Sequence, residues 1–329
     1  MIKLLIGGSP CTFWSIAQKN NRETEASGLG WELFKNYLIA KEKFNPDYFL
    51  YENNKSAAQA IKDQISRELG VDLMHINSAL VSAQTRQRFY AFNWKVKQPA
   101  DRGIFLQDIL IREICDTFEN VGECETLKRQ IPKIVKKKGY LPEMFNAYNA
   151  QEIKEKSPTL STGSMVTSSC ATIILVPTAR KIYEVKNGKI TYAGEQYPVK
   201  LPDGYYAMRK LTVEECCRLQ TLRDDYCRVV SASQAYKGIG NGWTAEIIIH
   251  ILNGALATVP RDEEIVVLSM YDGIGTGRYC LDKMGFTNIK YYAYEIDKYA
   301  KQIALSNYPD IIQMGDAFDL RNPDWTIGY

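Results

Sequence analysis

The sequence of 329 residues predicts an α/β protein with a second, smaller domain inserted into it. Near both ends of the chain, short apolar runs alternate with segments of helical spacing, a rhythm typical of a parallel sheet covered by helices on both faces. Between about residues 94 and 206 this rhythm is lost. The length fits two domains of roughly 150 residues. We therefore expect one domain over residues 1–95 and 206–329, and a second over residues 96–205.

The first part of the chain alternates strand-like and helix-like segments. The apolar run at residues 4–6 ends in Gly7-Gly8-Ser9-Pro10, as a buried strand does where it enters a loop. Trp31, Phe34 and Leu38 have helical spacing, and their segment ends before a proline. The expected elements are strands at residues 4–6, 48–51 and 74–81 and helices at residues 31–43 and 56–69.

The middle of the chain consists of short β-like pieces at residues 172–176, 181–185 and 189–193. The pair Asn187-Gly188 between the last two is typical of a hairpin turn. These features predict a smaller, mixed or β-rich domain. A local basic run typical of a solvated face, which would also suit contact with phosphate, comprises Lys133, Lys136, Lys137 and Lys138.

The last part of the chain predicts helices at residues 213–222 and 244–257 and then a β-α-β series. This series has strands at residues 266–270, 291–294 and 311–314, with a glycine-rich loop after the first strand and helices between the strands. Such a series predicts the half of the fold that binds a nucleotide.

Composition and charge exclude several classes of protein. Hydrophobic residues make up 45% and charged residues 24% of the chain, and 41 Lys and Arg against 38 Asp and Glu give a net charge of +3. This is an ordinary globular composition, which excludes intrinsic disorder, collagen and coiled coil. The most apolar stretch, residues 247–259, contains His250 and falls short of the roughly 20 residues of a membrane span. We expect no secretory signal, no membrane contact and a cytoplasmic location.

The eight cysteines form no Cys-x-x-Cys pair, and the chain has only two histidines. We therefore expect no metal site. All cysteines except Cys11 are interpreted as small buried or half-buried hydrophobic residues in a reducing compartment.

A first group of candidate functional residues follows the strands near the C-terminus. The loop after residues 266–270 lets main chain approach a ligand closely, and an acid about twenty residues later can accept hydrogen bonds from ribose hydroxyls. Together they predict a dinucleotide or S-adenosylmethionine site at the carboxyl ends of the strands. The candidates are Tyr271, Asp272, Gly273, Ile274, Gly275, Thr276 and Gly277 in the loop, then Glu295 and Ile296, and then Asp316.

A second group follows the strands near the N-terminus. Cys11 lies in a loop after the first strand, where a thiol can be exposed. Glu52 ends the second strand, and Arg86 and Arg88 follow the third at alternate positions. We expect the thiol, the carboxyl and the two guanidinium groups to converge on one crevice.

Six motifs of the chain resemble those of the DNA (cytosine-5)-methyltransferase family. They are Gly8-Ser9-Pro10-Cys11, Glu52-Asn53-Asn54, Gln84-x-Arg86-x-Arg88, Arg209-x-Leu211-Thr212-x-x-Glu215, Gly240-Asn241-Gly242 and Tyr271-x-Gly273-x-Gly275. The resemblance covers both ends of the chain and omits only the middle, which varies in that family. It implies the Rossmann-like fold of S-adenosylmethionine-dependent methyltransferases, with a target-recognition domain inserted.

The order of these motifs departs from the order usual in the family. Most members begin with the glycine-rich cofactor motif, whereas here the cofactor motifs come last. Joining Tyr329 to Met1 would restore the usual order, so the chain resembles a circularly permuted member of bacterial or phage type. Permutation is physically acceptable where the chain ends lie close together at the surface.

The resemblance also implies roles for the candidate residues. Cys11 would add to C6 of a cytosine flipped out of the duplex, Glu52 would act as an acid near N3, and Arg86 and Arg88 would hold O2 and orient the loop and the acid. S-adenosylmethionine would contact the first group of residues together with Pro10, Asn241 and Gly242. Double-stranded DNA would contact Ser15, in the loop over residues 15–30, and the lysines of residues 133–138 in the recognition domain.

Other functions remain open at this point. A tRNA cytosine-5 methyltransferase would use the same motifs, and a DNA-binding protein without catalysis would keep the same fold. An NAD-dependent oxidoreductase would use the glycine loop, but its reaction would give no role to Cys11 or to the two arginines. We expect a monomer. Whether a restriction endonuclease that does not contact the chain acts beside it stays open.

Overall fold

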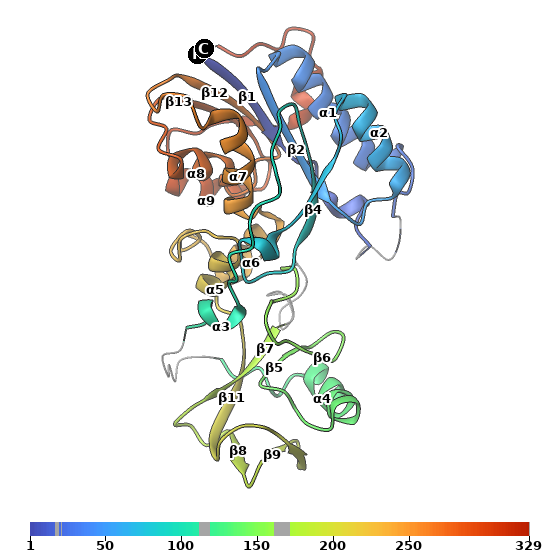
Figure 1. Cartoon of the computed structure of the whole chain (residues 1–329), viewed down its shortest axis with the longest axis vertical. Coiled ribbons are helices and arrows are strands. Elements are labelled where there is room, and N and C mark those ends of the chain that lie inside the picture. The colour runs from blue at the N-terminus through green and yellow to red at the C-terminus, as the bar shows by residue number, and fades with distance from the viewer. Residues whose placement is uncertain (17–19, 21, 112–118, 161–171, 329) are drawn as a thin grey trace.

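The computed structural model describes residues 1–16, 20, 22–111, 119–160 and 172–328. Its larger part is built on a seven-stranded sheet (Figure 1). In their order across the sheet the strands are β14 (Ile312–Gly315), β13 (Ile289–Tyr294), β12 (Ile265–Met270), β1 (Ile2–Gly7), β2 (Tyr48–Asn54), β4 (Gln87–Phe92) and β3 (Met74–Asn77).

Neighbouring strands from β14 to β2 are parallel, whereas β4 is antiparallel to both β2 and β3. The sheet is therefore parallel as expected from β14 to β2, but not at the edge formed by β4 and β3. The expected strand at residues 74–81 stops at Asn77, whose side chain accepts a hydrogen bond from the Ala79 N–H and starts the short helix η2 (Ser78–Leu80). So short a connection returns the chain in the opposite direction, because parallel neighbours need a long crossover.

Helices cover both faces of this sheet, as expected. On one face lie α1 (Gly28–Phe44) and α2 (Gln59–Leu69), and on the other lie α7 (Ala245–Leu256), α8 (Thr276–Lys283) and α9 (Lys298–Asn307) (Figure 1). Alternate residues of β1 serve the two cores, since Leu4 and Ile6 pack with α7 and α8 while Leu5 packs with α1 and α2. Helix α2 begins three residues later than expected because the Ser56 hydroxyl donates to Asn54 Oδ1 in a turn.

A second seven-stranded sheet, antiparallel throughout, is formed by residues between β4 and β12. Its core includes the apolar stripe Leu127, Ile131 and Ile134 of helix α4 (Glu125–Lys138). In their order across the sheet its strands are β10 (Glu195–Pro198), β9 (Lys189–Tyr192), β8 (Tyr183–Lys186), β11 (Gly204–Lys210), β7 (Thr172–Pro177), β5 (Met144–Asn146) and β6 (Gln151–Glu152).

The predicted hairpin at Asn187-Gly188 is confirmed. Strands β8 and β9 pair on either side of it, and both turn residues have positive φ (52° and 70°), as a two-residue hairpin turn of type I′ requires. Helix α4 is not among the expected elements, because its lysines and the internal Pro132 hide its apolar stripe. The other helices are α3 (Leu106–Ile109), α5 (Val213–Leu219) and α6 (Ala232–Asn241).

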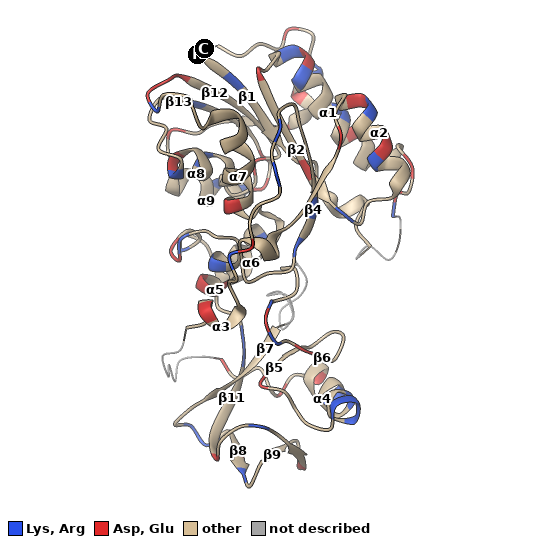
Figure 2. Cartoon of the chain, in the orientation of Figure 1, with Lys and Arg blue, Asp and Glu red and all other residues tan. Residues whose placement is uncertain are grey.

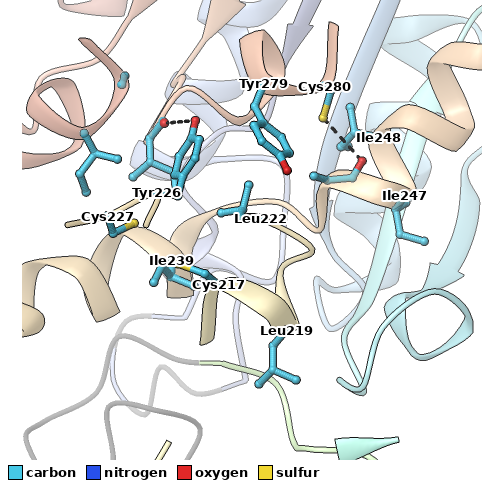
Figure 3. Close-up of a cluster of buried hydrophobic side chains, with 14 of the residues drawn as sticks. Cys217, Leu219, Leu222, Tyr226, Cys227, Ile239, Ile247, Ile248, Tyr279 and Cys280 are labelled. Carbon is cyan, nitrogen blue, oxygen red and sulfur yellow. Dashed lines mark hydrogen bonds between the residues drawn. The ribbon is translucent and has the colours of Figure 1, made fainter. Parts of the chain in front are cut away.

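Four cysteines belong to the hydrophobic core, as predicted. Cys217, Cys227 and Cys280 lie among Leu222, Tyr226 and neighbouring apolar side chains (Figure 3), and Cys216 is equally buried. Cys124 is half-buried, and Cys115 and Cys170 lie outside the described residues. Among the described residues, no helix combines the length and the apolar character that crossing a membrane requires.

Candidate active site

The candidate residues meet at one edge of the larger sheet. Cys11, Tyr271, Glu295 and Asp316 follow the parallel strands β1, β12, β13 and β14. Glu52 does not end its strand as expected but lies two residues before the end of β2, because Asn53 and Asn54 still pair with β4. Because β4 runs in the opposite direction, its first residues reach the same edge, and Arg88 lies opposite Asn54 of β2. The two groups of candidates, far apart in the sequence, therefore face one crevice.

A cavity of about 420 Å³ at this edge is lined by both groups. The predicted catalytic residues on its wall are Cys11, Glu52, Arg86 and Arg88. The predicted cofactor residues on its wall are Pro10, Asn241, Gly242, Tyr271, Asp272, Gly273, Ile274, Thr276, Glu295, Ile296 and Asp316.

Two predicted cofactor residues, Gly275 and Gly277, do not line this cavity. Gly275 has a φ of 79° and precedes helix α8, where a Cβ would lie 3.1 Å from the Cβ of Ala304. A Cβ on Gly277 would collide with Ile6 and with the Tyr291 hydroxyl of the sheet. Both glycines thus serve the approach of α8 to its neighbours, since no side chain fits there.

A second, open cleft of about 810 Å³ adjoins the first cavity. Cys11, Arg88 and Asn241 line both spaces, so Cys11 lies at the boundary between them. The cleft is also lined by Ser15, one of the residues predicted to contact DNA, and by Thr159. The Thr159 hydroxyl donates to the Thr85 carbonyl at 2.6 Å, which ties this residue to the larger sheet.

The loop that carries Cys11 is held by side chains of β2. Asn53 Nδ2 donates to the Ser9 carbonyl at 3.0 Å, and the hydroxyls of Ser9 and Tyr51 are 2.7 Å apart. Cys11 itself is half-buried and starts the short helix η1 (Cys11–Phe13). The main chain around Cys11 is therefore fixed, and the residue lines two open spaces.

The carboxyl of Glu52 is held at both oxygens. Arg88 Nε lies 3.0 Å from Oε1, and Trp243 Nε1 donates to Oε2 at 3.0 Å. Glu52 is 9% exposed, so the charge of Arg88 acts on it with little screening by solvent.

The two arginines occupy different environments. Arg86 is 3% exposed and donates to the carbonyls of Leu160, Gly240 and Gly242 at 3.3, 3.1 and 2.9 Å. Burial lowers the pKa of Arg86 to about 9, which leaves it cationic at neutral pH. Arg88 pairs with Glu52 and lines both open spaces. Arg86 thus anchors the main chain, and Arg88 lies where the 420 Å³ cavity and the open cleft adjoin.

The other end of the 420 Å³ cavity suits a nucleoside. Ile296 and Phe318 line it although they are 71% and 37% exposed, and they offer an apolar surface to a planar base. Glu295 Oε2 accepts from the Gly273 N–H at 2.8 Å, which places a carboxylate beside the glycine loop.

Two buried polar atoms of the glycine loop have no hydrogen-bond partner within the described part of the chain. They are Asp272 Oδ2 and Thr276 Oγ1. Asp272 Oδ1 accepts from the hydroxyls of Ser269 and Tyr291 at 2.7 and 2.6 Å, yet burial raises the pKa of Asp272 to about 6. Together with the apolar wall and the acids, these atoms fit a cofactor that has a nucleoside and further polar groups.

The predicted DNA-binding lysines lie away from both open spaces. Lys133, Lys136, Lys137 and Lys138 are exposed on the last turns of α4, beside the second sheet (Figure 2). Lys138 pairs with Glu152 at 3.2 Å. These lysines therefore belong to a separate surface. Within the described ranges, no group of three or more His, Cys, Asp and Glu side chains is placed to hold a metal ion.

Sequence reasoning missed several residues of the site. Trp243 follows directly on the predicted Asn241-Gly242 pair, so its position was a usable signal. The others come from helices and from the turn after β14, and only tertiary packing brings them in. They are Leu29, Leu33, Gln234, Lys237, Tyr299 and Phe318.

The mixed α/β sheet with its glycine loop after β12 is consistent with the fold of S-adenosylmethionine-dependent methyltransferases. A family model for the C-5 cytosine-specific DNA methylase matches residues 1–255. The chain belongs to this family, whose members are cytosine-5 methyltransferases that use S-adenosylmethionine.

Two further comparisons complete this result. A mutant of DNMT2 from Spodoptera frugiperda is similar in structure over 76% of this chain and 78% of that chain, with 14% identity and a TM-score of 0.46. No curated protein matches the sequence.

Proposed function

We propose that the chain transfers a methyl group from S-adenosylmethionine to C5 of a flipped-out cytosine in a specific double-stranded DNA sequence, through a covalent bond between Cys11 and C6. The observation that carries this proposal is the position of Cys11 at the boundary between the 420 Å³ cavity and the open cleft. A thiol there reaches a cytosine that enters from the cleft and faces a cofactor held in the cavity.

The side chains divide the chemistry among them. C5 of cytosine is a poor nucleophile until the Cys11 thiolate adds to C6, which gives the ring the character of an enamine. Glu52 acts as the acid at N3 and so stabilises the negative charge that the addition builds up. Arg88, paired with Glu52 and open to both spaces, holds O2 of the base, while Arg86 orients the loop.

The cofactor supplies an electrophilic methyl group on a sulfonium. Glu295, Asp316, Ile296 and the glycine loop bind and orient it in the cavity. When C5 takes the methyl group, S-adenosylhomocysteine remains as the leaving product. Water then takes the C5 proton and the bond between Cys11 and C6 breaks, which restores the aromatic ring and the free thiolate.

Recognition of DNA is assigned to the second sheet and its surroundings. We propose that residues 1–95 and 206–329 form the catalytic domain and that residues 96–205 form the recognition domain. The separate core of the antiparallel sheet supports a second domain, but the boundary at 205 falls inside β11, whose Tyr206 and Met208 belong to that core. The α4 lysines bind phosphate, and the target base must leave the duplex because the thiol cannot reach it inside the helix.

We also propose that the chain is circularly permuted. In support, β1 lies between β12 and β2, so the cofactor strands β12, β13 and β14 and the catalytic strands fill opposite halves of one sheet. The N-terminal amine contacts Glu263 just before β12, and the Tyr292 hydroxyl of the next strand, β13, donates to the carbonyl of Gly328. A sheet requires its strands in place rather than in a given sequence order.

The test is transfer of labelled methyl from S-adenosylmethionine to unmethylated duplex DNA and, in parallel, to bulk tRNA. Cys11→Ala serves as the control, with cofactor binding measured to show that this variant folds. Label in DNA that disappears with Cys11→Ala is the expected result. Label in tRNA alone assigns an RNA substrate, and absence of label in both from protein that binds the cofactor refutes the enzymatic proposal.

A further inference from the structure

The Glu52 carboxyl receives its second hydrogen bond from a residue that none of the sequence motifs assigns to catalysis. Trp243 Nε1 donates to Glu52 Oε2 at 3.0 Å, across 191 positions of the chain. We propose that Trp243 is a positioning residue that orients the Glu52 carboxyl toward the cytosine. The inference rests on the proposed function, because it concerns how the acid of that reaction is held.

The main chain next to Trp243 is fixed by buried side chains. Arg86 Nη2 donates to the carbonyls of Gly240 and Gly242, at 3.1 and 2.9 Å. Gln220 Nε2 donates to the carbonyls of Ile239 and Gly242, at 2.9 and 3.0 Å. Arg86 and Gln220 are 3% and 0% exposed. The direction of the indole is therefore set by contacts that solvent does not loosen.

Main chain near Cys11 also confines Glu52. A Cβ on Gly8 would lie 2.6 Å from the Glu52 carbonyl oxygen and 3.1 Å from Oε2, so the loop toward Cys11 packs directly against this residue. With Arg88 at Oε1 and the indole at Oε2, both oxygens are held in one orientation. An indole N–H donates only, so it fixes Oε2 as an acceptor without exchanging a proton with it.

Two arginines thus act on one acid by different routes. Arg88 touches Glu52 directly, and Arg86 acts through the end of α6 and Gly242, which directly precede Trp243. The buried Arg86 therefore contributes to the reaction indirectly, although its guanidinium donates only to main-chain carbonyls. It also predicts that Trp243 affects the addition of Cys11 to C6 rather than cofactor affinity, although its ring lines the cofactor cavity.

The experiment compares Trp243→Phe with Trp94→Phe. Phenylalanine keeps an aromatic ring and removes the N–H, and Trp94 loses an equivalent bond, 2.8 Å to the Ile251 carbonyl, outside both open spaces. The readouts are exchange of the C5 hydrogen of cytosine in duplex DNA, which reports the addition step, kcat for methyl transfer, and the Kd of S-adenosylmethionine. Circular dichroism checks the fold.

Trp243→Phe is expected to lower both the exchange rate and kcat by about tenfold or more, the scale of one hydrogen bond to a charged group. The Kd of S-adenosylmethionine is expected to change less than about twofold, which is below the effect of removing one hydrogen bond to the cofactor. Trp94→Phe is expected to match the wild type. Trp243→His, which keeps a ring N–H, is expected to retain more exchange than Trp243→Phe.

If Trp243→Phe exchanges the C5 hydrogen at the wild-type rate, the inference is overturned. A rise in the Kd of S-adenosylmethionine with an unchanged exchange rate also overturns it, since the indole then only lines the cavity. Should Trp243→Phe not fold, Trp243→Leu against Trp243→His repeats the comparison of a side chain without and with an N–H. A wild-type chain that methylates neither DNA nor tRNA refutes the proposed function and this inference together, whereas an active wild type with unaffected variants refutes the inference alone.

Discussion

Replacing Glu215 with Gln breaks a buried ion pair that joins β11 to α5. Glu215 is 0% and Arg209 is 2% exposed, and Arg209 Nη1 and Nη2 donate to Glu215 Oε2 and Oε1, each at 2.8 Å. The main-chain N–H groups of Thr212 and Ile111 donate to the same two oxygens, also at 2.8 Å. The carboxylate therefore offers acceptors to donors from three segments of the chain.

The magnitude follows from these four bonds. In Gln an NH₂ group replaces one oxygen and faces two donors, so one bond to a charged group and one main-chain bond are lost. A charged hydrogen bond contributes about 1.5–3 kcal/mol, and a buried N–H left without a partner costs about 1–3 kcal/mol. We expect Glu215→Gln to lower the free energy of unfolding by about 4 kcal/mol, within the range for breaking a buried pair.

Urea unfolding followed by circular dichroism measures this loss. Glu246→Gln is the matched control, because Glu246 pairs with Arg102 at 2.7 Å with both side chains partly exposed. Such a surface pair contributes less than about 1 kcal/mol. A loss for Glu215→Gln no larger than that of the control would show that the buried pair does not stabilise the fold as argued.

Three further outcomes can be checked. Because burial raises the pKa of Asp272 to about 6, the stability that its neutral carboxyl contributes is lost as pH rises from about 4 through 6. Over that interval the free energy of unfolding of Asp272→Asn should therefore rise by up to ~3 kcal/mol relative to the wild type. If urea unfolding shows the same pH dependence of stability for both proteins, this argument is wrong. Changing Lys133, Lys136 and Lys137 together to Gln should reduce the salt dependence of duplex DNA binding. The slope of log K against log salt concentration should fall in magnitude by about 0.9 for each phosphate that the lysines no longer neutralise. An unchanged slope would show that α4 does not contact DNA. Gly277→Ala, whose Cβ would meet Ile6 and Tyr291, should cost about 1–3 kcal/mol, and a thermal midpoint equal to that of the wild type contradicts the packing argument.

Much of the larger sheet could be predicted because its signals are local. Periodicity and neighbouring turn residues predict the strand that begins at Tyr48 and a helix between the last two strands, which the structure has as α9. The Asn187-Gly188 hairpin was placed by the two residues that adopt positive φ most readily. Helix α4 was missed because lysines and Pro132 mask its three buried positions.

For the site, the sequence by itself determined which side chains stand at strand ends. Cys11 and Glu295 are where they are because a strand stops and a loop begins, and neighbouring residues signal both events, whereas Glu52 lies within β2, which runs on to Asn54. Whether such side chains meet depends on the order and direction of the strands, which no local pattern carries.

The tertiary structure decided the tasks of residues that looked alike in the sequence. Arg86 and Arg88 are two positions apart, yet one binds loop carbonyls in the interior and the other faces the open cleft. Gly273 lines the cavity, whereas Gly277 makes room for a strand. Trp243 became part of the site through a hydrogen bond to a residue far away in the chain. The physical reason is that burial and hydrogen-bond partners are set by long-range packing, whereas the sequence pattern reports only the spacing of residues along one element.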